Sequence, residues 1–463
     1  MEQFLASPYF VSSPHPLLLF DYLKGLHPNY ERVDKMEIAS VLFPEYKDDR
    51  SFINQRYSEL SRLIETFLAV EIFKKDHYLN RTARRKALFE QQLYQIFQKS
   101  CQKQLRLLGS PKYYNAQAFL TAFEVYTDLY DHPSRISHET GAETYDQLDH
   151  YLDLFLISEK LKSFCDFYAQ QLTYDRSDQL RMVEGVLQAA ISLKSQYVQI
   201  ELLYELCLLL QQEFSEHHLD KVYQLFITKG SQLAKTDQAF MLQKLVSILN
   251  KALNIDRKFV TNLFELFQYG DQNELLILNG KVTDSTLFNI CTVGGFQKAD
   301  LWTQNLIRRY SPFLSPDTRR ESSLLAHALL QFHQNNYNQA HELLQQIPRK
   351  GMHYKLRIRT LDVRCLLGAH IKDPKSHLLE TLLSGLSAFR RFLNREPELS
   401  DNRKNQYRAF CKMAKKMAML RSINWQDKDA KASFKKALAE EKKIVLRPWL
   451  EDLLEEDGKS EPV

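Results

Sequence analysis

Apolar side chains recur along most of the chain with the spacing of an amphipathic helix. In the stretch 52–73, Tyr57, Leu60, Ile64 and Phe67 fall three or four residues apart and therefore share one helix face. The same spacing predicts helices over residues 81–108, 116–130, 145–172, 179–195, 198–213, 219–226, 238–253, 258–267, 322–334, 338–346, 354–367, 378–393, 402–422, 429–446 and 448–456. This pattern predicts an all-α protein.

Glycine and proline indicate where the predicted helices end. Gly109 is followed by a proline two residues later, which is typical of a helix stop and a breaker. Gly368 is expected to end the helix before it. The doublet Gly294-Gly295 is expected to divide the stretch 284–306 into two short helices.

Two stretches depart from helical periodicity. Residues 132–142 contain Pro133 and Gly141 and are predicted to form an exposed loop. Residues 275–278 are apolar, but no similar run lies nearby to pair with them as a second strand. We therefore expect almost no sheet.

Short predicted connections indicate antiparallel helical hairpins, which bury their apolar faces by stacking on one another. The clearest hairpin joins residues 322–334 to 338–346. The sequence predicts an irregular α–α superhelix, that is, a solenoid of hairpins. We divide it into an N-terminal helical segment, a hairpin array, and C-terminal helices with an acidic tail, over residues 1–110, 111–425 and 426–463.

Residues 324–348 resemble a tetratricopeptide repeat (TPR). Leu324 stands at the tryptophan position of that motif, Ala328 and Ala340 at its two small positions, and Leu344 at a large apolar position. The departures from the motif are His327, Gln331 and the early Pro348. The resemblance implies a TPR-like hairpin.

A second resemblance covers roughly the last third of the chain. The segments 382–393, 399–401, 407–410 and 448–450 resemble the C-terminal part of uncharacterised bacterial all-helical proteins with TPR-like hairpins. This resemblance implies a solenoid and brings no activity with it.

The composition limits the classes of protein that the chain can belong to. Its 463 residues are too many for one hydrophobic core, and 44% of them are hydrophobic, which suffices for packed domains. Only 13 residues are glycine, which argues against a Gly-rich nucleotide-binding loop.

Six widely spaced cysteines lack the spacing of a zinc site, and we interpret them as buried free thiols in a reducing compartment. The N-terminus does not fit a secretory signal, and no apolar run approaches the roughly 20 residues of a membrane span. We expect a cytoplasmic protein that does not contact a membrane.

Net positive charge is confined to one region. Residues 390–447 hold 17 Lys and Arg against 7 Asp and Glu, a net charge of +10. Residues 448–463 hold one Lys and six acidic residues, a net charge of −5. Because the whole chain carries +5, residues 1–389 are neutral overall.

The basic region supplies the candidate binding residues, which are Arg390, Arg391, Arg403, Lys404, Arg408, Lys412, Lys415 and Lys416. Phe389, Phe392, Tyr407 and Phe410 interleave with them. These rings either stack on bases or, as their helical spacing favours, face the core. The cations are then a solvated face, a surface for an acidic protein, or a surface for nucleic acid.

A second basic stretch is interpreted as a solvated helix face. It consists of Arg81, Arg84, Arg85, Lys86, Lys99, Lys103 and Arg106, with Glu90 as its one acidic residue.

Motifs for catalysis are missing from the sequence. It contains no GxGxxG, GxxxxGK[ST], GxSxG or HExxH motif. His217 and His218 are adjacent, so on a helix they point about 100° apart and cannot easily share a metal. We therefore predict no catalytic, cofactor-binding or metal-binding residues, and no enzyme.

The pattern favours a scaffold or adaptor that binds another protein or a peptide, because stacked hairpins present an extended binding surface. The alternative is a nucleic-acid-associated protein that uses the basic region. The oligomeric state is left open.

Overall fold

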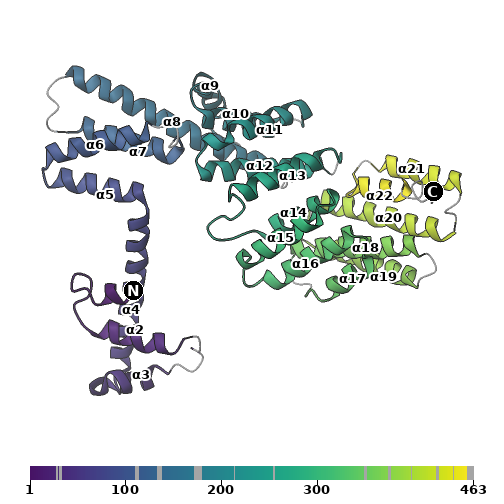
Figure 1. Cartoon of the computed structure of the whole chain (residues 1–463), viewed down its shortest axis with the longest axis horizontal. Helices are drawn as coiled ribbons and strands as arrows, with labels where there is room; N and C mark the ends of the chain where they lie inside the picture. Colours follow the sequence, from purple (N-terminus) through teal and green to yellow (C-terminus); the bar gives the residue numbers. More distant parts are fainter. Residues whose placement is uncertain are drawn as a thin grey trace. The chain divides into compact units, whose positions relative to one another are not determined.

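The computed structural model describes residues 1–27, 30, 34–109, 114–132, 138–171, 180–212, 214–253, 256–348, 352–373, 377–397, 399–423, 427–441 and 443–455. This part of the chain is all-helical and contains no strand (Figure 1), as the periodicity predicts. Residues 275–278 contribute only to an isolated antiparallel bridge between Leu278 and Lys281.

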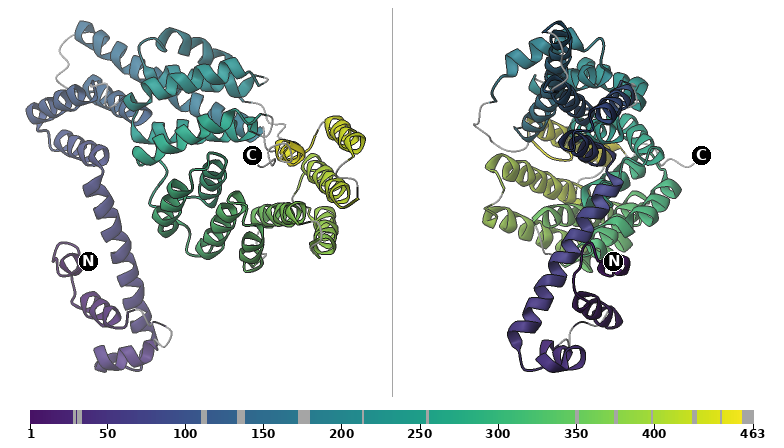
Figure 2. Two further views of the ribbon diagram at one scale, coloured as in Figure 1. Left: turned by 45° about the vertical axis from the view of Figure 1, so that its right-hand side comes forward. Right: turned by 90° about the vertical axis from the view of Figure 1, so that its left-hand side faces the viewer.

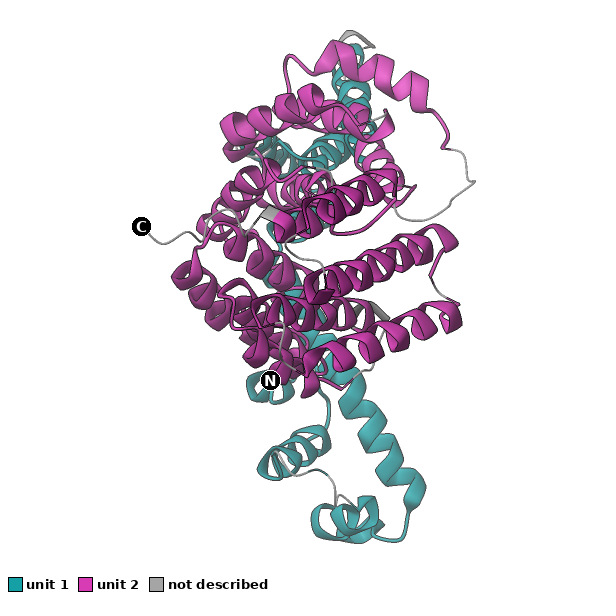
Figure 3. Ribbon diagram, turned by 90° about the vertical axis from the view of Figure 1, so that its right-hand side faces the viewer, with its two compact units in different colours: residues 1–159 teal, residues 160–463 magenta. Residues whose placement is uncertain are grey.

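The chain forms two compact units, residues 1–159 and 160–463, coloured separately in Figure 3. The division falls inside α8 (His138–Gln171). The sequence predicts boundaries at residues 110 and 425 instead, and that division into three segments stays a prediction.

The first unit begins with a small helical group that the sequence pattern did not predict. Phe4, Leu19 and Leu60 are buried together, and Figure 2 shows α4 continuing from this group as a long helix. Asp76 ends α4 and caps the next helix by accepting two backbone hydrogen bonds. The helices before α8 are α1 (Glu2–Leu5), α2 (His15–Gly25), α3 (Lys35–Leu42), α4 (Arg50–Lys75), α5 (His77–Glu90), α6 (Tyr94–Leu108) and α7 (Ala116–Tyr130).

The prediction of one helix over residues 81–108 is wrong, because α5 and α6 are separate helices. The chain turns at Gln92, whose φ is 57°. Arg85 is fully buried, and its side chain donates to Asp128 and Gln104. Arg85 therefore does not belong to the solvated face predicted for the second basic stretch, because an internal carboxylate neutralises it.

The second unit is a succession of helices that mostly pack on their neighbours in sequence. In addition α14 packs on α16, α16 on α18, and α18 on α20. Its helices after α8 are α9 (Val183–Leu193), α10 (Val198–Gln211), α11 (Glu216–Lys229), α12 (Lys235–Ala252), α13 (Phe259–Gln272), α14 (Asp284–Phe296), α15 (Asp300–Tyr310), α16 (Arg319–His333), α17 (Tyr337–Gln345), α18 (Met352–Lys372), α19 (Leu378–Arg395), α20 (Asp401–Ile423), α21 (Lys428–Glu440) and α22 (Arg447–Glu455).

The two helices predicted over 284–306 are confirmed as α14 and α15, but the glycine doublet belongs to the last turn of α14, so the predicted position of the break is wrong. A Cβ on Gly294 would come within 2.0 Å of Thr303 Oγ1, and one on Gly295 within 2.1 Å of the His333 ring. The two glycines therefore let α15 and α16 approach α14 closely. The connection to α15 comes later, at Lys298, where φ is 53°.

Gly368 likewise lies inside α18, which continues to Lys372, so the predicted stop is wrong. A Cβ there would come within 2.7 Å of the Tyr337 ring on α17. In the predicted loop over residues 132–142, α8 already begins at His138, and residues 133–137 lie outside the described residues. His132 is buried, with its ring stacked on Phe97 at 5.3 Å.

The hairpin predicted at 322–346 is confirmed as α16 and α17, and the two helices pack against each other. Ala328 and Ala340, at the small positions of the TPR-like motif, are both fully buried. All six cysteines are buried, as predicted, and unpaired. Burial raises the pKa of the Cys101 thiol to about 12, which keeps it protonated.

Candidate anion-binding groove

The candidate site is built on α19 and α20, which pack against each other (Figure 1). Both are amphipathic. Leu382 and Leu393 of α19, like Met413 and Met417 of α20, are fully buried. Because these apolar positions take the inner faces, the charged residues between them are left on the outer faces.

The aromatic residues of this region belong largely to the core. Phe389 and Phe410 are fully buried, so base stacking by these two rings is excluded and the core interpretation is confirmed. Phe392 and Tyr407 are half-buried, and their ring centroids lie 6.3 and 5.9 Å from that of Phe389.

The outer faces of α19 and α20 border an open hollow of about 560 Å³, which we call the basic groove. Leu383 and Leu386 of α19 and Met419 of α20 give the lining an apolar component. Its cations are Arg390, Arg408, Lys412, Lys415 and Lys416. These are five of the eight candidate binding residues. The other three, Arg391, Arg403 and Lys404, do not line the groove.

The groove cations have few acidic partners. The Arg408 guanidinium donates to the amide oxygens of Asn394 and Asn405, at 2.8 Å each, and so keeps its full charge. Lys412 Nζ lies 2.5 Å from a carboxylate oxygen of Glu441. Within the described ranges, no carboxylate lies within 4 Å of the charged groups of Arg390, Lys415 or Lys416. Among its described residues, the groove lining therefore combines five positive charges with one negative charge.

Cys411, which also lines the groove, does not provide a nucleophile. Burial raises the pKa of its thiol to about 12, although the nearby Arg390 acts in the opposite direction. The thiolate is the nucleophilic form of cysteine, and it is scarce at neutral pH at such a pKa. The groove thus has the chemistry of a binding surface for an anionic ligand with an apolar component.

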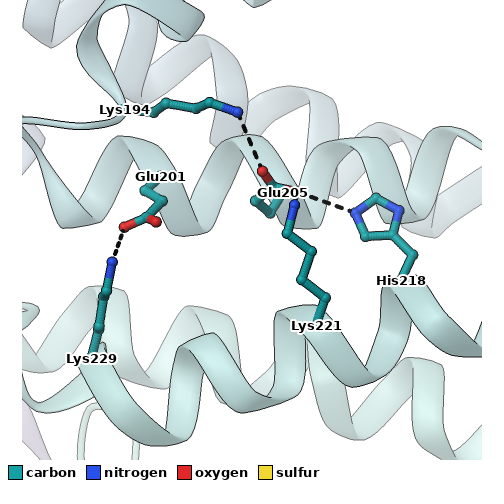
Figure 4. A network of polar contacts seen from close by, with 6 residues as sticks. All are labelled: Lys194, Glu201, Glu205, His218, Lys221 and Lys229. Carbon is teal, nitrogen blue, oxygen red and sulfur yellow. Dashed lines mark hydrogen bonds and ion pairs between the residues drawn. The ribbon is translucent and has the colours of Figure 1, made fainter.

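A second polar cluster, which we call the Glu205 cluster, joins α9, α10 and α11 (Figure 4). The Glu205 carboxylate, only 7% exposed, lies 2.8 Å from Lys221 Nζ, 3.4 Å from Lys194 Nζ and 3.3 Å from His218 Nε2. His218 is thus half-buried and engaged with a carboxylate, rather than at the surface. One helical turn away, Glu201 pairs with Lys229 at 2.7 Å.

The Glu205 carboxylate has a perturbed acidity. Burial raises its pKa, but the hydrogen bond and charge of Lys221, together with Lys194, outweigh burial and hold the pKa below its usual range. The carboxylate therefore stays ionised at neutral pH and fully engaged by its cations. We interpret the cluster as a connection between helices.

The sequence did not single out Glu441, the one acidic residue among the described residues of the groove lining. It was included in a helix predicted over 429–446, but α21 ends at Glu440. Leu446, with φ at 58°, then leads into α22. Of the predicted acidic tail, residues 456–463 lie outside the described residues, and Asp452 of α22 pairs with Arg257.

Comparison with family models, with curated proteins and with solved structures finds no significant match. In the part of the chain that is described, no group of three His, Cys, Asp or Glu side chains is placed to hold a metal. Across the same residues, no helix has the length and apolar character to cross a membrane.

Proposed function

We propose that the protein is a non-catalytic interaction module that binds an acidic segment of another protein in the basic groove. The observation that carries this proposal is the imbalance of charge, because the described residues around an open hollow of about 560 Å³ include five cations and one carboxylate. Cations that lack internal partners are available to a ligand and raise the rate at which an acidic partner associates.

The lining favours a peptide over a nucleic acid. Proteins that bind single strands offer exposed aromatic rings for base stacking, and no aromatic residue lines the groove among the residues that the structure describes. Leu383, which is half-buried, and Met419, which is exposed, instead match the apolar side of an amphipathic acidic segment.

We also propose that the helices from α14 to α20 form a solenoid of TPR-like hairpins that carries the groove. The packing of α14, α16, α18 and α20 in succession supports this architecture. We place the protein in the cytoplasm, because six unpaired cysteines suit a reducing compartment.

A pair of matched double substitutions tests the proposed function. Lys415→Gln/Lys416→Gln removes two groove cations, and Lys435→Gln/Lys436→Gln removes two exposed cations of α21 that do not line the groove. The probe is a labelled helical peptide of Glu and Leu residues, with binding measured by fluorescence anisotropy on the full chain at low salt. The groove variant should bind about tenfold more weakly, since an exposed cation contributes up to about 1 kcal/mol. The α21 variant should change binding less than twofold.

Equal losses in the two variants would mean that the peptide senses only overall charge, and would overturn the groove as the site. A single-stranded RNA of equal charge serves as the competing ligand. If the RNA binds more tightly than the peptide and the groove variant removes that binding, the nucleic-acid alternative holds instead.

A further inference from the structure

Glu441 is the one carboxylate among the described residues that line the basic groove. The Glu441 side chain is 26% exposed, and its carboxylate forms an ion pair with Lys412. The Lys412 side chain is 58% exposed, so a ligand can reach it. The other four groove cations have no such partner in the described ranges. Among the described groove cations, Lys412 is therefore the one whose charge is already compensated by a carboxylate of the protein.

The position of Glu441 is held from both sides. It directly follows the last residue of α21, where Leu438 is buried. The Arg447 guanidinium donates to the Glu441 carbonyl oxygen at the start of α22. That helix is anchored in turn by Trp449, whose ring centroid lies 6.3 Å from that of Phe410 in α20. The packing of α21 and α22 thus places the Glu441 carboxylate at the groove.

The preceding residue provides a contrast. Glu440 is exposed, does not line the groove and forms no ion pair within the described residues. Two neighbouring glutamates therefore have the same charge and nearly the same position in sequence, but only Glu441 contacts a groove cation.

We infer that the Glu441 carboxylate occupies the position that a carboxylate of the acidic partner takes against Lys412, so that Glu441 is an internal competitor of the ligand. This inference rests on the proposed function and specifies it. The ligand is a peptide with carboxylate side chains, one of which displaces Glu441 from Lys412. Displacement costs the Glu441–Lys412 contact and returns an equivalent contact to the ligand.

Substitution of the two glutamates separates competition from overall charge. Glu441→Gln should strengthen binding of the Glu and Leu peptide about threefold to fivefold at low salt, the range expected for one exposed ion pair. Glu440→Gln removes the same charge without freeing Lys412 and should change affinity less than 1.5-fold, an estimate based on weak long-range attraction between exposed charges. Equal gains in the two variants would overturn the inference.

A double-mutant cycle with Lys412→Gln gives a second, independent readout. In the wild-type background, Lys412 is already neutralised, so its loss should weaken peptide binding less than twofold, as expected of a paired surface charge. In the Glu441→Gln background, the same substitution should remove the entire gain of about threefold to fivefold. Identical effects of Lys412→Gln in both backgrounds would contradict the competition.

The outcomes also distinguish this inference from the proposed function. If neither the wild-type chain nor the Glu441→Gln variant binds the peptide at low salt, the proposed function fails. If the wild-type chain binds and Lys415→Gln/Lys416→Gln weakens binding, but Glu441→Gln equals Glu440→Gln, the groove stands and only the competitor role of Glu441 fails.

Discussion

The Glu205 cluster and the basic groove contain the same kinds of residue in different proportions. In the cluster, one buried carboxylate meets two lysines and a histidine from two neighbouring helices. In the groove, the described lining contains five cations and one carboxylate, and this carboxylate pairs with Lys412. The comparison indicates that the position of the acidic residue, more than the number of cations, decides whether a basic surface stabilises the fold or binds a ligand.

Burial explains why the two arrangements behave differently. A carboxylate at 7% exposure has lost most of its water, so its lysines must replace those hydrogen bonds and are thereby committed to the fold. Exposed lysines keep their water and lose it only to an anionic ligand. The cluster should therefore govern stability, and the groove should govern binding.

The largest effect should come from removing the charge of the cluster. Glu205→Gln should lower the local free energy of opening of α10 and α11 by about 2 kcal/mol, because a neutral amide cannot replace charge-assisted bonds to Lys221 and Lys194. Hydrogen exchange of α10 and α11 amides measures this quantity, which suits a chain of two units better than one melting temperature.

Glu201→Gln is the matched control on the same helix. Glu201 is more exposed and, among the described residues, pairs only with Lys229, so its substitution should cost about 0.5 kcal/mol. Equal costs at the two positions would break the comparison, since they would show that the additional cations around Glu205 contribute nothing.

A smaller effect should appear in the pH dependence of the opening free energy of α10 and α11. Because the pKa of Glu205 in the folded chain is held below its usual range by Lys221 and Lys194, its contribution is complete above about pH 5. It should be lost as pH falls through the lowered folded pKa. The difference in α10 and α11 protection between the wild-type chain and Glu205→Gln should therefore shrink as the pH falls below about 5.

His218 Nε2 lies 3.3 Å from the same carboxylate, so the pH series is compared in a His218→Gln background, which removes the imidazole. The other charged groups that contact Glu205 are Lys194 and Lys221. A difference that grows toward pH 3 would contradict the assigned direction of the Glu205 shift.

The smallest effect should come from the groove. Lys415→Gln/Lys416→Gln should change the opening free energy of α20 by less than about 0.5 kcal/mol, because neither lysine has an acidic partner among the described residues. The same hydrogen-exchange measurement on α20 amides checks this. A loss comparable to that of Glu205→Gln would show that the groove lysines hold the fold, and would weaken the case for a binding surface.

Helix positions were largely predictable, because an amphipathic helix has to repeat its apolar residues at a period set by its own geometry. The helix predicted over 116–130 matches α7 (Ala116–Tyr130) residue for residue. The three helices before α4 were missed, since short helices with little apolar periodicity leave a weak pattern.

At three glycines, the helix ends predicted from the sequence were wrong, because tertiary packing gives these glycines another role. Gly294, Gly295 and Gly368 stand inside helices because neighbouring side chains, including His333 and Tyr337, need the space of a missing Cβ. Local rules treat glycine as a helix stop, and they contain no information about which helix will approach.

The sequence by itself determined that this protein is all-helical and that its net positive charge lies in residues 390–447, because periodicity and charge are properties of the chain. Only the tertiary structure decided that five of the eight candidate cations line one groove, and that Glu441 from beyond α21 meets Lys412 there. The physical reason is that neutralisation requires contact within about 4 Å, and the contacts between Lys412 and Glu441, 29 residues apart, exist only after the helices pack.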